Sequence, residues 1–272
     1  MLEVDKALIE GELYRIDVGC GDNALVFVHG FSCNADDWIP QLDALADRYR
    51  CVAVDLPGHG RSLKNARPTV ESIAACVIRE IERLDLGAAV LFGHSFGSRV
   101  IGEIYRQAPH LIRALVYVDG SIQQADPATA ARNFERQVEK AGFEKILDAL
   151  YDDFFVASSP DNVRRMILSR RTEIDATFHL PLCVDMIAWD AAHGEEVIRS
   201  IKVPCLVIQS SSVGANMRRT AIEPGIDTPL MALIRQAVPS AHIDIVRGVG
   251  HFPMLEAPAR TNAIIEEFLA GI

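Results

Sequence analysis

The chain has 272 residues, of which 49% are hydrophobic and 24% charged, and its formal net charge is −10 at pH 7. This is the composition of a folded globular protein, and it excludes an intrinsically disordered one. An acidic surface repels phosphate backbones and anionic lipid, so we expect neither nucleic acid nor a membrane as a partner. The length fits one large α/β domain or one domain that carries an insertion.

The N-terminal segment and the cysteines indicate the compartment. The first 19 residues are acidic and interrupted by charges, which fits neither a signal peptide nor a membrane span. The six cysteines are scattered without a CxxC pair, and several lie in apolar runs, so we expect reduced core residues and a cytoplasmic location. Neither cysteines nor histidines cluster at the spacing of zinc ligands, and we expect no metal and no organic cofactor.

Six short apolar runs predict buried parallel strands, because they lack the alternation of a strand with one wet face. Helical patterns lie between most of them, and this alternation indicates a parallel sheet covered on both faces. Residues 2–18 are expected to add an antiparallel edge pair. The predicted strands cover residues 24–30, 50–58, 88–95, 114–120, 205–211 and 242–248, and the predicted helices cover residues 35–48, 70–86, 96–108, 229–238 and 257–270.

The alternation stops between residues 121 and 202, where the chain carries helical patterns and no convincing strand. An all-helical insertion between two strands of a sheet is typical of a lid over a pocket. We therefore predict a core domain of residues 1–120 and 203–272 and a helical cap domain of residues 121–202. Four helices are predicted in the cap, over residues 127–141, 143–157, 160–171 and 182–193.

Ser95 stands between Gly93 and Gly97, where a predicted strand ends and a predicted helix begins. A G-x-S-x-G motif in this context is a nucleophile elbow, a strained turn whose flanking positions have to be small. The alternative is an ordinary strand-to-helix turn that contains a serine. We favour the elbow, because both flanking elements are predicted. Such a turn presents the serine hydroxyl at a helix N-terminus, where developing negative charge is favoured.

Two other loops are predicted at the same edge of the sheet, and they supply what a serine nucleophile needs. His251 follows the last strand and precedes the last helix, so it is the candidate general base. Its alternative role is that of a loop histidine bonded to backbone. The loop of residues 28–34 turns after the strand beside the elbow. The backbone N–H groups of Phe31 in this loop and of Phe96 after Ser95 form the predicted oxyanion hole.

Four stretches in chain order, VHGF, DLPGHGRS, GHSFGS and GHFPMLEAP, resemble the α/β-hydrolase fold superfamily, in particular its serine hydrolase and esterase branch with a helical cap. They are spread over nearly the whole chain outside the predicted cap. The resemblance implies a mostly parallel eight-stranded sheet with helices on both faces and an inserted all-helical cap. It also implies a triad of serine, acid and histidine in the order seen here.

The acid of the triad has two main candidates. Most members of the superfamily carry it after the strand that corresponds to residues 205–211, where this chain has Val213 instead of an aspartate. Asp119 ends the preceding predicted strand, and some branches, among them haloalkane dehalogenases and certain lactone hydrolases, carry their acid there. Glu223 is the alternative, at a reasonable spacing before the histidine, and Asp227 is a weaker one. We prefer Asp119 for its position at a strand end.

Aromatic and methionine side chains predict an apolar substrate pocket, although each of them fits core packing as well. Arg218 and Arg219, after the strand of residues 205–211, are interpreted as residues of a solvated loop, with contact to a substrate carboxylate as the alternative. The candidate pocket residues are Phe134, Phe154, Phe155, Met186, Trp189 and Phe252.

These features predict a serine hydrolase that acts on a small ester, lactone or thioester. Two alternatives use the same scaffold. One is a cofactor-free dioxygenase, since some of these carry a serine, a histidine and an acid after the same earlier strand. The other is a signalling protein that binds a small ligand and then a partner. Epoxide and haloalkane chemistry is disfavoured, because those relatives carry an aspartate where this chain has Ser95.

Overall fold

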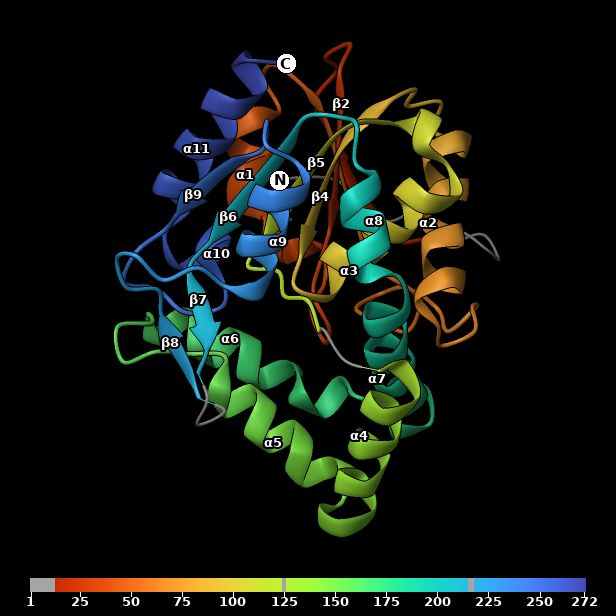
Figure 1. Cartoon of the computed structure of the whole chain (residues 1–272). Helices are drawn as coiled ribbons and strands as arrows, with labels where there is room; N and C mark the ends of the chain where they lie inside the picture. Colours follow the sequence, from red (N-terminus) through yellow and green to blue (C-terminus); the bar gives the residue numbers. More distant parts are fainter. Residues whose placement is uncertain (1–12, 124–125, 215–217) are drawn as a thin grey trace.

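The computed structural model describes residues 13–123, 126–214 and 218–272. Its centre is a sheet in the order β1-β3-β2-β4-β5-β6-β9, in which only β1 and β3 pair antiparallel (Figure 1). A mostly parallel sheet is confirmed, but within the described residues it has seven strands and not eight. The strands are β1 (Arg15–Val18), β2 (Ala24–Val28), β3 (Arg50–Val54), β4 (Ala89–His94), β5 (Ile112–Val118), β6 (Cys205–Gln209) and β9 (His242–Ile245).

The predicted antiparallel edge pair falls only partly within the described residues. An antiparallel pair was expected from residues 2–18, and β1 is the strand that the structure describes in this range, paired with β3. The remainder of that expected pair, residues 2–12, lies outside the described residues. A further antiparallel pair, β7 (Ser211–Val213) with β8 (Arg219–Ala221), forms a separate small sheet that the sequence patterns did not predict.

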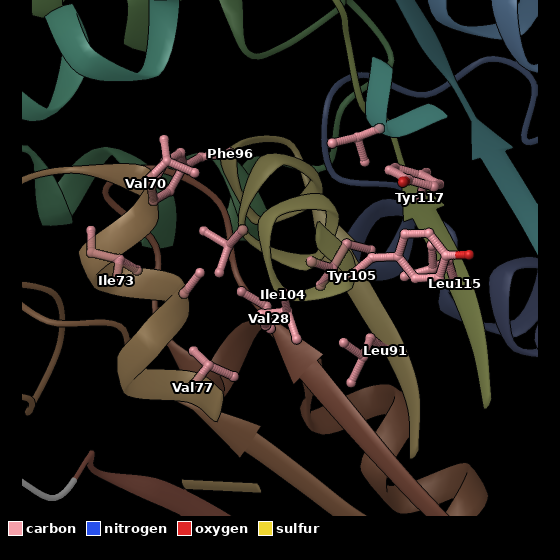
Figure 2. Close-up of a cluster of buried hydrophobic side chains, with 14 of the residues drawn as sticks. Val28, Val70, Ile73, Val77, Leu91, Phe96, Ile104, Tyr105, Leu115 and Tyr117 are labelled. Atoms are coloured by element: carbon pink, nitrogen blue, oxygen red, sulfur yellow. The ribbon is translucent and has the colours of Figure 1, made fainter. Parts of the chain in front are cut away.

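The central strands are buried on both faces, which explains their nearly continuous apolar sequences. In β2, Val26 and Val28 belong to the core on one face, and Leu25 and Phe27 belong to the core on the other. Helices α2, α3, α8 and α9 cover the first face, and α1, α10 and α11 cover the second (Figure 1). Figure 2 shows part of the first core, in which side chains of α2 and α3 lie beside those of the sheet.

Apart from α3 and α8, the helices that cover the sheet begin with a capping side chain or with a proline in their first turn. The Thr69 hydroxyl accepts a hydrogen bond from the Ser72 N–H at the start of α2, and Thr228 caps α9 in the same way. These helices are α1 (Ile39–Leu45), which follows a 3-10 helix (Ala35–Trp38), α2 (Val70–Arg83), α3 (Phe96–Gln107), α8 (Glu195–Ser200), α9 (Pro229–Ala237), α10 (Pro253–Glu256) and α11 (Pro258–Ala270), with a second 3-10 helix (Pro109–Leu111) before β5.

Between β5 and β6 the chain forms a helical insertion, which we define as α4 to α7. Figure 1 shows it below the sheet, on the side where the parallel strands end. A π-helical turn (Asp190–Gly194) joins it to α8, which packs on α3 and α9. Its helices are α4 (Pro127–Ala141), α5 (Phe143–Asp153), α6 (Asp161–Ser169), a 3-10 helix (Arg170–Glu173) and α7 (Ala176–Trp189). Its role as a cap and the domain limits at 121 and 202 stay predictions.

The last helix of the insertion begins earlier than predicted. The pattern predicted it over residues 182–193, but α7 begins at Ala176, because the Asp175 side chain accepts a hydrogen bond from the Thr177 N–H and caps it. Pro181 lies within this helix. None of the helices in the described parts of the chain is long and apolar enough to cross a bilayer. All six cysteines are free thiols, and Cys20 is the exposed one.

Candidate active site

Ser95 lies in the turn between β4 and α3, and the backbone of this turn is strained. Its angles are φ 51° and ψ −111°, a conformation that residues other than glycine rarely adopt. A Cβ atom on Gly93 would lie 2.4 Å from the Gly97 carbonyl oxygen, and one on Gly97 would lie 2.4 Å from the Val28 carbonyl oxygen. Only glycine therefore allows β2, β4 and α3 to approach this closely. This is the geometry of a nucleophile elbow.

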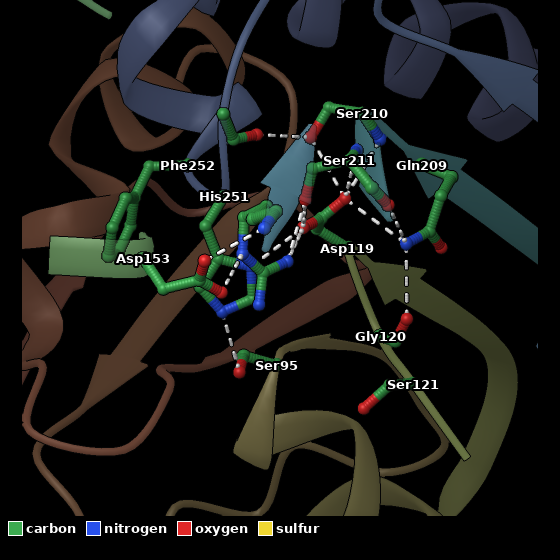
Figure 3. Close-up of polar contacts among 12 residues, drawn as sticks. Ser95, Asp119, Gly120, Ser121, Asp153, Gln209, Ser210, Ser211, His251 and Phe252 are labelled. Atoms are coloured by element: carbon green, nitrogen blue, oxygen red, sulfur yellow. Dashed lines mark hydrogen bonds and ion pairs between the residues drawn. The ribbon is translucent and has the colours of Figure 1, made fainter. Parts of the chain in front are cut away.

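The loop after β9 brings His251 to Ser95. The imidazole Nε2 lies 2.9 Å from Ser95 Oγ, and Nδ1 lies 2.6 Å from Asp119 Oδ2 (Figure 3). An ionised carboxylate only accepts hydrogen bonds, so Nδ1 carries the proton and Nε2 accepts from the serine hydroxyl. The Ser95 side chain makes no capping bond to α3. Its hydroxyl is therefore directed to the imidazole and not to the helix.

The orientation of the His251 ring is fixed by contacts on several sides. The backbone N–H of His251 donates to the Phe154 carbonyl oxygen at 2.9 Å, and its own carbonyl oxygen accepts from His94 Nε2 at 2.8 Å. The Phe154 ring stacks on the imidazole, with ring centroids 5.2 Å apart and planes inclined by 20°. The ring is consequently held in the position in which it contacts both the serine and the acid.

Asp119 follows β5, is buried, and has its carboxylate surrounded by donors (Figure 3). Its Oδ1 accepts from the backbone N–H groups of Ser210 and Ser211, both at 2.8 Å, and from the Ser210 hydroxyl at 2.9 Å. The Gln209 amide donates to the same oxygen at 3.1 Å. Its Oδ2 accepts from the Ser211 hydroxyl at 2.5 Å and from Arg219 Nη1 at 3.3 Å, in addition to the imidazole. The end of β6, the start of β7 and the start of β8 thus hold the Asp119 carboxylate in place.

The ionisation states of acid and base follow from these contacts. Burial by itself would raise the pKa of Asp119, but the hydrogen bond and charge of His251, the charge of Arg219 and the Ser211 hydroxyl lower it below its usual value. Burial, followed by the charge of Arg219, lowers the pKa of His251 to about 4, against the opposing hydrogen bond to Asp119. At neutral pH the carboxyl is therefore ionised and the imidazole neutral, as a serine triad requires at the start of its reaction.

The predicted oxyanion loop passes directly beside Ser95. A Cβ atom on Gly30 would lie 3.2 Å from Ser95 Cβ, so the backbone there is in close contact with Ser95, and the Phe31 N–H belongs to the next residue. Phe96 opens α3, and N–H groups in the first turn of a helix have no acceptor within the helix. Both predicted donors therefore belong to backbone segments that flank Ser95.

The alternative acids lie apart from this site. Glu223 is exposed beyond β8, and the Asp227 carboxylate pairs with Arg235 Nε at 3.3 Å. Val213, which stands where the superfamily usually has its acid, is 47% exposed in β7. Of the two main candidates, only Asp119 contacts the imidazole in the structure.

The interpretation of Arg219 as a residue of a solvated loop is wrong. Its side chain is 12% exposed, and Nη1 donates to the Ser211 hydroxyl at 2.7 Å as well as to the Asp119 carboxylate. The cause is the pairing of β7 with β8, which turns Arg219 back over the end of β6. Arg218, in contrast, is exposed. The polar run Gln209–Ser211 at the end of an apolar strand was the sequence signal for a buried anion nearby.

Three of the predicted pocket residues pack together beside the imidazole. Phe154, Phe155 and Phe252 are all buried. The ring centroid of Phe252 lies 5.5 Å from that of Phe154 and 5.8 Å from that of Phe155, and it also lies 5.3 Å from that of His251. Phe154 and Phe155 of the helical insertion, together with Phe252, thus form an aromatic cluster beside the His251 imidazole. A direct contact with substrate stays a prediction for each of its members.

The other predicted pocket residues lie on α4 and α7. Trp189 is buried, its Nε1 donates to a Glu103 carboxylate oxygen at 2.8 Å, and its ring lines a small cavity against α3. Phe134 and Met186 are half-buried and pack against the core of the first sheet face. Their role in binding also stays a prediction.

A polar cavity lies beside the predicted oxyanion loop, where this loop meets the helical insertion. His59 and His179 are buried there, and burial lowers the pKa of both. His59 Nδ1 lies 3.0 Å from a backbone carbonyl oxygen and donates to it, so Nε2 is an acceptor. Within the described residues, no group of three His, Cys, Asp or Glu side chains is arranged to hold a metal ion. The cavity is lined by Ser32, Cys33, Gly58, His59, Gly60, Arg170, Glu173, Ile174 and His179.

The chain is similar in sequence to known proteins along all or part of its length. A dihydrolipoyllysine-residue acetyltransferase component of an acetoin cleaving system from Pseudomonas putida is 25% identical over 97% of this chain and 68% of its own length. A pimeloyl-[acyl-carrier protein] methyl ester esterase from Sodalis glossinidius is 36% identical over 40% of this chain and 41% of its own length. The chain spans less than half the length of most of the curated relatives that it matches.

The same fold occurs in the enol-lactonase from Burkholderia xenovorans LB400. That structure covers 95% of this chain and 96% of its own, with a TM-score of 0.74 and 20% sequence identity. The sequence model of the alpha/beta hydrolase family matches residues 25–264, which include the elbow, the acid and the base. The chain therefore belongs to the alpha/beta hydrolase family.

Proposed function

We propose that the protein is a serine hydrolase that cleaves a carboxylic ester, lactone or thioester of a small, largely apolar molecule through an acyl-enzyme. The observation that carries the proposal is the hydrogen-bonded series from Ser95 through His251 to Asp119, with bonds of 2.9 and 2.6 Å. The names of two relatives, a methyl ester esterase and an enol-lactonase, support the choice of a carboxylic ester or lactone.

In the proposed reaction, Ser95 Oγ attacks the substrate carbonyl carbon while His251 Nε2 takes its proton. The Asp119 carboxylate stabilises the imidazolium that forms and keeps the ring in the correct tautomer. The backbone N–H groups of Phe31 and Phe96 hold the oxyanion, and each such donor is worth about 3 kcal/mol of transition-state stabilisation. His251 then returns the proton to the leaving oxygen or sulfur. A water molecule, deprotonated by the same imidazole, hydrolyses the acyl-enzyme.

The helical insertion acts as a cap in this proposal, and it excludes bulk water from the acyl-enzyme until hydrolysis. Two contacts support this role, since the Phe154 carbonyl oxygen accepts from the His251 N–H and the Phe154 ring stacks on the imidazole. A cytoplasmic location is proposed on the ground that all six cysteines are free and five of them are buried.

The test is covalent labelling by a fluorophosphonate probe, followed by mass spectrometry of the labelled peptide, together with hydrolysis of p-nitrophenyl esters of graded acyl length. We expect the label on Ser95. The variant Ser95→Ala should lose about 10⁴-fold or more in kcat, whereas Ser240→Ala, at an exposed serine after α9, should keep full activity.

Two results would contradict the proposal. One is a folded protein that neither takes the label nor hydrolyses any ester of the series. The other is oxygen uptake with a heteroaromatic substrate in place of ester hydrolysis, which would favour the cofactor-free dioxygenase.

A further inference from the structure

Arg219 lies where the acid of the candidate triad, the β7–β8 pair and the helical insertion meet. Its Nη1 is 3.3 Å from Asp119 Oδ2 and 2.7 Å from the Ser211 hydroxyl. Its backbone N–H donates to Asp153 Oδ1 at 2.7 Å, and its Nε lies 3.9 Å from Asp153 Oδ2. One arginine, with a side chain that is 12% exposed, thus contacts Asp119 on one side and a carboxylate of the insertion on the other.

Asp153 is the last residue of α5, and the residues after it attach the insertion to the loop of the base. The Phe154 carbonyl oxygen accepts from the His251 N–H at 2.9 Å. A few residues on, the Ser158 hydroxyl donates to the Gly248 carbonyl oxygen at 2.6 Å. The end of α5 therefore contacts the base through Phe154 and the acid through the arginine. A movement of this segment would change both contacts together.

We propose that Arg219 is a positioning residue of the triad, which joins the Asp119 carboxylate to the helical insertion and limits the proton affinity of His251. This inference rests on the proposed function, because it concerns the base of that reaction. A carboxylate beside an imidazole stabilises the imidazolium and makes the base stronger. A cation on the same carboxylate oxygen opposes that effect, so the base remains neutral in mildly acidic solution.

Among the described residues, four ionisable groups approach the His251 ring from the elements packed around it. Asp119 approaches from the end of β5 and Asp153 from α5, and the negative charges of both favour the imidazolium. His94 approaches from β4 with its ring centroid 4.7 Å away, and burial lowers its pKa, so it is neutral. Arg219 approaches from β8 and is the cation among these four. Its removal would leave two carboxylates acting on the imidazole without compensation.

The test compares Arg219→Gln with Arg165→Gln, which removes the same charge from an exposed site on α6. The first measurement is the NMR titration of His251 in histidine-labelled protein, and the second is the pH dependence of fluorophosphonate labelling. We expect Arg219→Gln to move both midpoints to higher pH by about one unit, the lower end of the range that a nearby charge produces. Arg165→Gln should move neither.

Two further variants separate electrostatics from structural damage. Arg219→Lys keeps the charge, so its midpoints should lie between those of the native protein and Arg219→Gln, even if its melting temperature falls. Asp153→Asn removes a negative charge, so its midpoints should not rise. Equal midpoints for Arg219→Gln and Arg165→Gln would overturn the inference, as would a rise in Asp153→Asn. A native protein that resists the label at every pH would contradict the proposed function, and the NMR titration would still decide the role of Arg219.

Discussion

The nucleophile and the acid of the candidate triad are held by different kinds of structure. The backbone of Ser95 is positioned mainly by main-chain geometry, through a strained turn, two obligatory glycines and the start of α3. Asp119 is positioned by a network of side chains and N–H groups from residues 90 to 100 positions further along the chain. The first arrangement is local in sequence, and the second exists only once β5, β6 and β8 have come together.

The difference predicts which kind of substitution impairs Ser95 and which kind impairs Asp119. The glycines of this turn cannot be replaced, because a Cβ atom would overlap with backbone atoms that cannot move away. The acid has a redundant set of donors on Oδ1, so the loss of one donor is compensated by the others. Its charge, however, is balanced by specific partners. We therefore expect the nucleophile to be sensitive to volume and the acid to be sensitive to charge.

The largest effect is expected from a change of charge without a change of volume, Asp119→Asn. The amide would place an N–H donor against His251 Nδ1, which favours the tautomer with its proton on Nε2. In that tautomer the imidazole cannot accept the Ser95 proton. Loss of the correct tautomer costs about 10⁴-fold in kcat. The variant Glu223→Gln, at the exposed alternative acid, should stay within about twofold of the native rate. The measurement is kcat of both variants on one ester. A larger loss in Glu223→Gln than in Asp119→Asn would assign the acid of the triad to Glu223.

The next effect tests the nucleophile with volume alone, through Gly97→Ala. The new Cβ would lie 2.4 Å from the Val28 carbonyl oxygen and 2.7 Å from the His29 carbonyl oxygen, and neither is part of a flexible side chain. Overpacking of this kind typically costs about 1–3 kcal/mol of stability, and the displaced elbow should lower kcat by about 10²-fold.

The control for this variant is Gly142→Ala, at a glycine with nothing within 4 Å of the new Cβ but with φ of 85°. Backbone strain at this position should lower the melting temperature slightly, whereas kcat should stay unchanged. If Gly97→Ala keeps the native rate, close approach at the elbow is not what positions Ser95.

The same contrast explains what could be predicted from the sequence. Ser95 and its glycines form a contiguous motif between a strand and a helix, so both the turn and its geometry followed from local pattern. His251 was assigned because parallel strands place their carboxyl ends at one edge of the sheet, and it follows such a strand end. Asp119 was assigned because it ends a predicted strand at which some branches of the superfamily carry their acid. The mostly parallel sheet was predictable for a similar reason, because strands buried on both faces have uninterrupted apolar sequences.

The parts that were missed depend on contacts between distant segments. In the sequence Arg219 resembles any loop arginine, and its low exposure results from the pairing of two three-residue strands that are too short to show a pattern. The role of Ser210 and Ser211 as donors follows only from the neighbouring positions of β5 and β6 in the sheet. The aromatic residues of the insertion were identified as pocket candidates from composition, but whether a buried ring packs or binds depends on which helix faces it.

The smallest expected effect is a difference in pH dependence between variants at the Ser95 turn and variants at Asp119. Main-chain geometry does not titrate, whereas the carboxylate changes the pKa of His251. The pKa of His251 is about 4, and the base acts only when neutral, so kcat/KM should be level near neutrality and fall tenfold per unit below about pH 4. Gly97→Ala should lower the rate equally at every pH and leave this midpoint unchanged. Asp119→Asn removes the charge that favours the imidazolium, so its residual activity should titrate at lower pH. Rates are best measured by rapid pH jump.

A pH jump is needed because the fold itself should weaken over the same range. Burial lowers the pKa of His29, His59, His94, His179 and His251. Between the unfolded pKa of about 6.5 and the folded one, the unfolded chain binds more protons, so stability is complete above pH 6.5 and declines as the pH falls. One such histidine contributes about 1.4 kcal/mol per pH unit in that window, or about 2–4 °C in melting temperature for a chain of this size.

Removing one of them, in His179→Gln, should reduce the slope of melting temperature against pH, and the same change at exposed His110 should not. An unchanged slope in both variants would mean that the buried histidines are not the groups through which acid destabilises the fold.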